Sequence, residues 1–168
     1  MTGFKRSVAL VAFVCVAGCS APAPVGVLGE SNGASSVQAG NAKATETARV
    51  ILAEINAERA AKGLGALQTN PRLSAAAQAH AEDMAARGYF SHVSKDGSTP
   101  KIRAERAGYR ACLIAENISR GYPSAQQAVA GWMASKGHRE NILRRGVSQI
   151  GIGIGAGRTY VTVFADPC

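Results

Sequence analysis

The segment QIGIGIG, residues 149–155, constrains the fold more than any other stretch of the sequence. Isoleucine and glycine alternate through it, which is the period-two pattern of a β-strand whose successive side chains point to opposite faces. One face carries isoleucines (Ile150, Ile152, Ile154) and the other carries glycines (Gly151, Gly153, Gly155). A row of glycines leaves no side chains to pack, so another part of the chain must approach that face closely. The G-x-G spacing does not indicate a dinucleotide-binding loop, because no helix follows it.

The surrounding sequence predicts an α+β domain over residues 43–168. Helical spacing and capping residues predict helices over residues 44–63, 70–88, 99–108 and 124–135. Alternating patterns predict strands over residues 111–118, 149–155 and 158–166. The last two strands are expected to form a hairpin across Ala156 and Gly157. Helices around a small antiparallel sheet make a domain that is large enough to bury its own core.

The N-terminus has the features of a bacterial lipoprotein signal over residues 1–18. Basic residues precede an apolar run that is too short to span a membrane, which takes about 20 residues. The run ends in VAGC, which resembles a lipobox, so we expect cleavage before Cys19 and a diacyl lipid on its thiol. Residues 19–42, rich in Ala, Gly, Ser and Pro, are expected to form a flexible tether. We therefore expect an exported lipoprotein of the outer membrane, periplasm or cell surface; an ordinary signal cleaved nearby would give a secreted protein.

Two cysteines remain in the expected mature domain, because Cys15 leaves with the signal and Cys19 carries the lipid. These two are Cys112 and Cys168, and in an oxidising compartment they predict a disulfide. The alternative is a pair of free thiols.

The charge of the chain narrows the classes of partner. Loss of Lys5 and Arg6 with the signal takes the formal net charge from +8 to +6. A basic surface favours anionic envelope glycans or lipids, and a protein ligand is a further option. Nucleic-acid binding is not expected, because aromatic residues are only 5% of the chain and the basic residues are scattered. We expect a monomer that meets the membrane through its N-terminal lipid.

Three histidines and one strand carboxylate are the candidates for a functional site. Glu116 falls on the apolar face of its strand, where a carboxylate is costly unless it is paired or opens into a cleft. The alternative is a solvated position on an edge strand. His92 and His138 each follow a predicted helix and are expected in turns, and neutral imidazoles suit zinc and similar ions. These positions form no linear metal motif. His80 lies on a packed helix face and is expected to be structural.

Several motifs together resemble a bacterial CAP domain, also called SCP-like, of the superfamily of cysteine-rich secretory and pathogenesis-related proteins. They are LSAAAQAHAEDMAARGYFSH, AENI, VAGWMASKGHRENIL, IGIG and YVTVFA, and with their flanks they cover residues 48–165. The resemblance implies an α-β-α sandwich with a three-stranded antiparallel sheet flanked by helices. It also implies a cleft with two histidines and two acids, in which the histidines of several members hold a divalent ion, often zinc.

Carried onto this sequence, the cleft histidines are His92 and His138, and the first acid is Glu116. The second acid of many relatives falls on Ser135, so one member of the tetrad is missing. We expect modest affinity for zinc or another divalent cation, with Glu116 as a third ligand or as a base for a bound water. Loss of the second acid weakens the case for acid–base catalysis.

The sequence therefore favours a binding or interaction module over an enzyme. Its cleft would bind a divalent cation at low affinity and a further ligand, without an organic cofactor. The first alternative is a metal-dependent hydrolase of the peptidase kind, with Glu116 as its catalytic residue. The second alternative is a lipid- or sterol-binding protein, which is also implied by the family.

Overall fold

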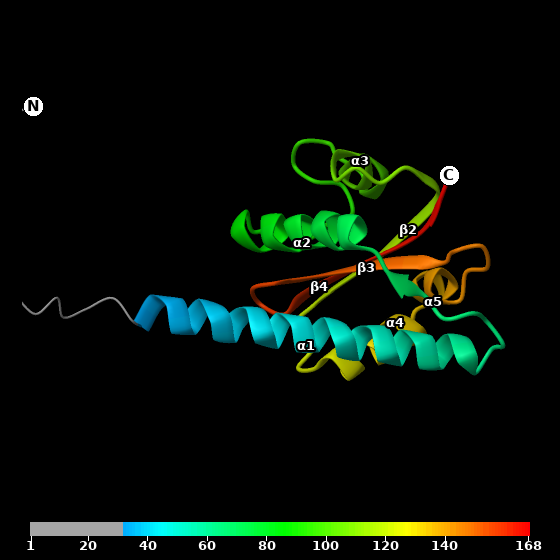
Figure 1. Cartoon of the computed structure of the whole chain (residues 1–168), viewed down its shortest axis with the longest axis horizontal. Helices are drawn as coiled ribbons and strands as arrows, with labels where there is room; N and C mark the ends of the chain where they lie inside the picture. Colours follow the sequence, from blue (N-terminus) through cyan, green and yellow to red (C-terminus); the bar gives the residue numbers. More distant parts are fainter. Residues whose placement is uncertain (1–31) are drawn as a thin grey trace, which may run out of the picture.

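The computed structural model of the chain describes residues 32–168, and it places helices on both faces of a central sheet (Figure 1). Its elements in chain order are α1 (Asn32–Ala60), β1 (Gln68–Thr69), α2 (Pro71–Ala86), α3 (Pro100–Arg106), β2 (Ala111–Arg120), α4 (Ala125–Ala134), α5 (Lys136–Ile142), β3 (Gln149–Gly155) and β4 (Thr159–Pro167). Helices α2 and α3 cover one face of the sheet, and α1, α4 and α5 cover the other. The predicted α+β class and α-β-α sandwich are confirmed.

The predicted signal, the lipidation residue Cys19 and the first part of the tether lie outside the described residues. Within residues 32–168, no helix is long and apolar enough to cross a membrane. Helix α1 begins at Asn32, earlier than the predicted domain boundary at Lys43. No proline lies between Asn32 and Ala60, and alanine recurs through this stretch, which favours one continuous helix.

The sheet has the strand order β1-β3-β4-β2. Strand β4 is central, and it pairs antiparallel with both β2 and β3, as the three-stranded antiparallel prediction requires. The prediction omitted the fourth strand, β1, which pairs parallel with the start of β3. Both residues of β1 are exposed, so this strand carries no hydrophobic alternation by which its sequence could have been recognised. Strand β2 forms the opposite edge of the sheet.

The glycine face of β3 lies directly against the backbone of α2. A Cβ added to any of the three glycines would overlap main-chain atoms of α2, at Leu73 for Gly151, at Ala77 for Gly153 and at Ala81 for Gly155. Four residues of helix advance about 6 Å and two residues of strand about 6.6 Å, so the two elements run in step. The segment that approaches the glycine face closely, as predicted, is therefore helix α2. This close packing also places His80 of α2 near the sheet.

Replacing Gly153 by alanine is expected to lower the free energy of unfolding by about 2–3 kcal/mol, because the added methyl group has no space beside Ala77 and the two elements must separate. Urea unfolding followed by circular dichroism would measure this loss. The matched control is Gly137→Ala in α5, where nothing lies within 4 Å of the new Cβ. That substitution should raise stability, by at most about 1 kcal/mol. Equal stability of Gly153→Ala and the native chain would contradict the close packing.

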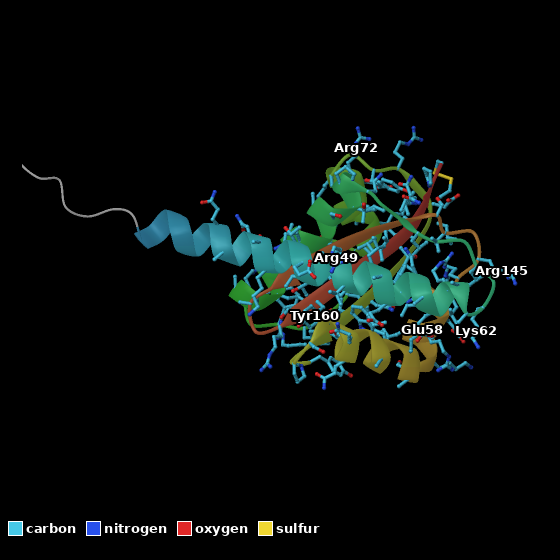
Figure 2. The ribbon with its side chains drawn as sticks, turned by 60° about the horizontal axis from the view of Figure 1, so that its bottom comes forward. Arg49, Glu58, Lys62, Arg72, Arg145 and Tyr160 are labelled. Carbon is cyan, nitrogen blue, oxygen red and sulfur yellow. A yellow bond between two sulfur atoms is a disulfide. The ribbon has the colours of Figure 1, made fainter. Side chains whose placement is uncertain are left out.

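Two short features determine where the site residues lie. Helix α5 was not predicted: the sequence placed His138 in a turn, and the structure places it inside this short helix. The predicted disulfide between Cys112 and Cys168 is confirmed, with their Cα atoms 4.9 Å apart (Figure 2). It joins the start of β2 to the residue after β4, two strands that already pair along their length.

Candidate functional site

Glu116 lies on β2 at the edge of the sheet and faces the layer formed by α2 and α3. Its register partner is Val163, which belongs to the core between the sheet and α2. The side chain of Glu116 is only 2% exposed. Desolvation of a carboxylate is costly unless the charge is paired, so the neighbours of Glu116 define the site. The solvated-edge alternative is excluded by this burial.

Arg103 from α3 is the cation that compensates Glu116. Its Nη2 donates to Oε2 of Glu116 at 2.6 Å. The Nη1 group donates to the backbone carbonyls of His92 and Ser98 and to the hydroxyl of Ser94. One buried guanidinium therefore holds the strand carboxylate and the loop that carries His92 in a fixed relation. Sequence reasoning missed Arg103, because nothing in the basic helix KIRAER marks which arginine turns inward.

His92 is brought to Glu116, as the cleft prediction requires. Its Nδ1 lies 2.8 Å from Oε1 of Glu116, and its side chain is 50% exposed. A carboxylate oxygen is the acceptor in this pair, so Nδ1 carries the hydrogen and donates it. The lone pair of His92 is therefore on Nε2, away from the carboxylate.

His80 is fully buried behind this pair and was correctly predicted to be structural. Its Nε2 donates to the carbonyl of Ser91 at 2.9 Å, and its Nδ1 accepts from the Ser94 hydroxyl at 3.2 Å. The same Nε2 is 4.0 Å from Oε1 of Glu116. Burial, the largest cause, lowers the pKa of His80 below its ordinary value of 6.5. His80 is thus a neutral part of the support beneath His92.

Acid is expected to destabilise the fold through His80. Between its lowered folded-state pKa and 6.5, the unfolded chain binds a proton that the folded chain does not. The free energy of unfolding therefore falls as the pH drops below about 6.5, and it continues to fall down to the folded-state pKa. Urea unfolding at about pH 7.5 and about pH 5 would measure this loss. The variant His80→Gln removes this titration and should show a smaller loss; an equal loss in both proteins would contradict the assignment.

His138 approaches the site from the other layer. Its backbone carbonyl accepts a hydrogen bond from the side chain of Asn117 at 3.0 Å. Asn141, also in α5, donates to the Asn117 side chain and to the backbone carbonyl of Glu116. Asn117 therefore fixes the backbone of α5 to β2. Burial, the largest cause, lowers the pKa of the half-buried His138, and the positive charge that His92 can carry lowers it further.

Ser135 is the residue between α4 and α5, half-buried, and its side chain makes no capping hydrogen bond. Among residues 32–168, no group of three or more His, Cys, Asp and Glu side chains is placed to hold a metal ion. The structure therefore does not support Glu116 as the third member of a ligand set. It leaves His92 and His138 as a pair of imidazoles.

The fold and this arrangement define a class of protein: an α-β-α sandwich with two histidines and a buried carboxylate at the edge of its sheet. The family described as "Cysteine-rich secretory protein family" (CAP) matches residues 52–164 of the chain. The chain belongs to the CAP family, which confirms the resemblance seen in the sequence.

Two proteins of Bacillus subtilis are similar in sequence. The chain is 38% identical over 98 residues to the uncharacterized protein YkwD, covering 58% of this chain and 38% of that protein. It is 35% identical over 118 residues to the uncharacterized membrane protein YlbC, covering 70% of this chain and 34% of that protein. The chain thus spans little more than a third of either relative.

Solved structures show the same fold. An extracellular protein of Bacillus anthracis that contains an SCP domain superposes with a TM-score of 0.67 at 29% identity, over 70% of this chain and 39% of that one. An outer surface protein of Borrelia burgdorferi also has a TM-score of 0.67, at 20% identity, over 73% of this chain and 94% of that one. At that lower identity the likeness concerns the fold alone.

Proposed function

We propose that the protein is an exported, lipid-anchored CAP domain that acts as a binding module, in which His92 and His138 hold a divalent cation such as zinc. The signal-like pattern of the N-terminal sequence and the likeness to an extracellular SCP-domain protein support export. The burial of Glu116 and the pairing of both its carboxylate oxygens favour a binding role over hydrolysis.

Both carboxylate oxygens of Glu116 are already engaged, one by His92 and the other by Arg103, and almost none of the side chain is exposed. A general base must reach the proton that it removes, directly or through one water. Glu116 has no such access, and its hydrogen bond to His92 fixes the orientation of that ring instead. This geometry favours a role in which Glu116 orients the ring of His92, over the hydrolase alternative in which Glu116 is the catalytic residue.

The two imidazoles fit a weak cation site. His92 keeps a free Nε2 lone pair on a half-exposed ring, and the lowered pKa of His138 favours the neutral form that binds metals. A carboxylate behind a ligating histidine fixes its tautomer and makes it a better ligand. Structural zinc sites use four protein ligands and catalytic ones three, so a pair gives modest affinity. A bound cation would supply a positive charge that could bind an oxygen atom of a further ligand in the cleft.

Zinc titration of the purified protein by calorimetry tests the cation site. Binding should be lost in His92→Ala and in His138→Ala, and weakened about 10- to 100-fold in Glu116→Gln, where the support of His92 is altered. Glu140→Gln is the matched control, because it changes an exposed carboxylate on helix α5, which also carries His138, and it should leave the zinc affinity unchanged. Unchanged zinc affinity in both alanine variants would refute the proposal.

The anchor has a separate test. Mass spectrometry of the protein extracted from membranes should find a mature N-terminus at Cys19 that carries lipid. An N-terminus at another residue, without lipid, would contradict the anchored form and leave a secreted protein.

A further inference from the structure

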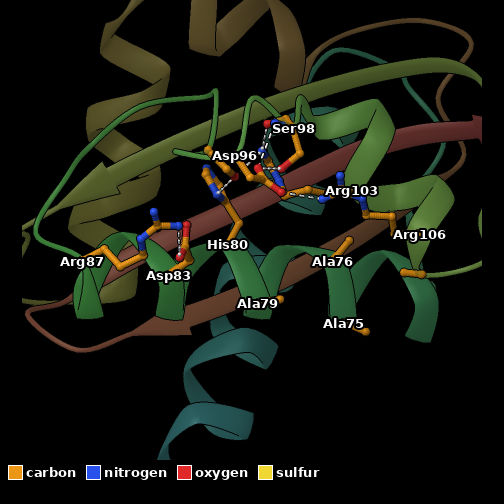
Figure 3. A pocket seen from close by; sticks show the side chains of 12 residues that line it. Ala75, Ala76, Ala79, His80, Asp83, Arg87, Asp96, Ser98, Arg103 and Arg106 are labelled. Atoms are coloured by element: carbon orange, nitrogen blue, oxygen red, sulfur yellow. Dashed lines mark hydrogen bonds and ion pairs between the residues drawn. The ribbon is translucent and has the colours of Figure 1, made fainter.

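A pocket of about 390 Å³ lies between α2 and the segment formed by residues 94–107 (Figure 3). This volume is within the range of about 300–1,000 Å³ that is usual for small-ligand sites. Its floor consists of three alanines of α2 (Ala75, Ala76, Ala79), and Ala107, just after α3, also lines the pocket. Its inner wall carries the polar side chains of His80, Ser94, Ser98 and Arg103, all of them more than nine-tenths buried.

Two exposed arginines stand at opposite ends of the pocket, Arg87 on the α2 side and Arg106 on the α3 side (Figure 3). Each makes a single ion pair through Nη1, Arg87 with Asp83 at 3.3 Å and Arg106 with Asp96 at 2.7 Å. A guanidinium has five N–H donors, so most of the donors on both residues are free.

The two aspartates, in contrast, have both of their oxygens engaged. Asp83 accepts from Arg87 on one oxygen and from the Tyr89 hydroxyl on the other. Asp96 accepts from Ser98 on one oxygen and from Arg106 on the other. The pocket therefore has an excess of donors, and its ligand must bring acceptors.

The Arg87 end is the more cationic of the two. Lys95 donates to the backbone carbonyl of Arg87 at 2.7 Å, which places a second positive charge beside that residue. Asp83 is the single carboxylate among these contacts, and its bond to Arg87 is long. A ligand carboxylate is therefore best complemented at this end, while Arg106 is left to meet a neutral carbonyl.

We propose that this pocket binds a short extended peptide of small residues, with its free carboxylate at Arg87 and its main chain along the alanine floor. The floor and Arg87 follow α2 over residues 75–87, which corresponds to about 18 Å of helix. Four or five extended residues at about 3.3–3.6 Å each match this length. Main-chain carbonyls supply acceptors for the free donors of Arg106, and methyl side chains suit a floor of alanines.

The histidine rings give a direct readout, because the chain contains only three and His80 lines the pocket. Acetyl-tetra-alanine with a free carboxylate, added to the purified full chain, should shift the ring NMR signals of His80 saturably and those of His138 much less. The matched peptide amide should bind at least about tenfold more weakly, because it lacks the charge that Arg87 meets. The same loss is expected for the acid with Arg87→Gln.

Two controls separate this site from general charge effects and from lipid binding. Arg145→Gln removes an exposed arginine at the end of the molecule where α1 ends (Figure 2), and it should leave the affinity unchanged. Ala79→Leu fills the floor and should abolish binding. Equal binding of acid and amide, full affinity in Arg87→Gln, or no His80 shift at about 10 mM peptide would overturn the proposal. A His80 shift with octanoate but not with the peptide would also overturn it.

Discussion

Replacing Arg103 by methionine is expected to lower the free energy of unfolding by about 3–5 kcal/mol, the usual cost of leaving one partner of a buried ion pair without the other. Glu116 would lose its buried cation, and only the half-exposed His92 would be left to bond it. Ser94, Ser98 and the His92 carbonyl would lose their shared donor at the same time. Urea unfolding near neutral pH measures the loss.

Two further variants separate the ion pair from simple loss of a long side chain. Arg106→Met changes an exposed arginine of the same helix, and it should cost less than about 1 kcal/mol. The double variant Arg103→Met with Glu116→Gln removes the unpaired charge and should recover part of the loss. If Arg103→Met and Arg106→Met destabilise equally, Glu116 does not depend on Arg103.

Loss of the disulfide is expected to cost about 4 kcal/mol, since it closes a loop with a sequence separation of 56 residues and so restricts the unfolded chain. The variant Cys112→Ser with Cys168→Ser should unfold at a lower urea concentration than the oxidised protein. Both cysteines are exposed, so a reductant should reach the bond without prior unfolding. The native chain treated with reductant should match the double variant, whereas the variant itself should not respond. An unfolding midpoint that reductant leaves unchanged would contradict this expectation.

The sequence predicted the parts of the fold whose pattern is local. The alternation of isoleucine and glycine in residues 149–155 identified β3 and required a close neighbour, which is α2. The capping residues Asn70 and Ser124 began their helices as expected, because a cap depends only on the next three residues. Helix α5 escaped prediction because its seven residues include a glycine and few apolar positions, and its stability comes from contacts with β2.

The site was predictable only in part. The placement of Glu116 on an apolar strand face indicated that it needs a partner, and the family resemblance pointed to His92 as a neighbour. The identity of the main partner depends on how α3 packs against β2, and no local pattern distinguishes Arg103 from the other arginine of that helix, Arg106. The role of Asn141 was missed for the same reason, since its bonds cross from α5 to β2.

The two histidines belong to opposite layers of the sandwich, and consecutive residues of one strand determine how they meet. Glu116 points to one layer and bonds the ring of His92, and Asn117 points to the other and bonds the backbone at His138. The distance between the two histidines is therefore set by two adjacent residues of β2 more than by the loops and turns around it. Any sliding of one layer against the other would change that distance, and with it the affinity of the proposed cation site.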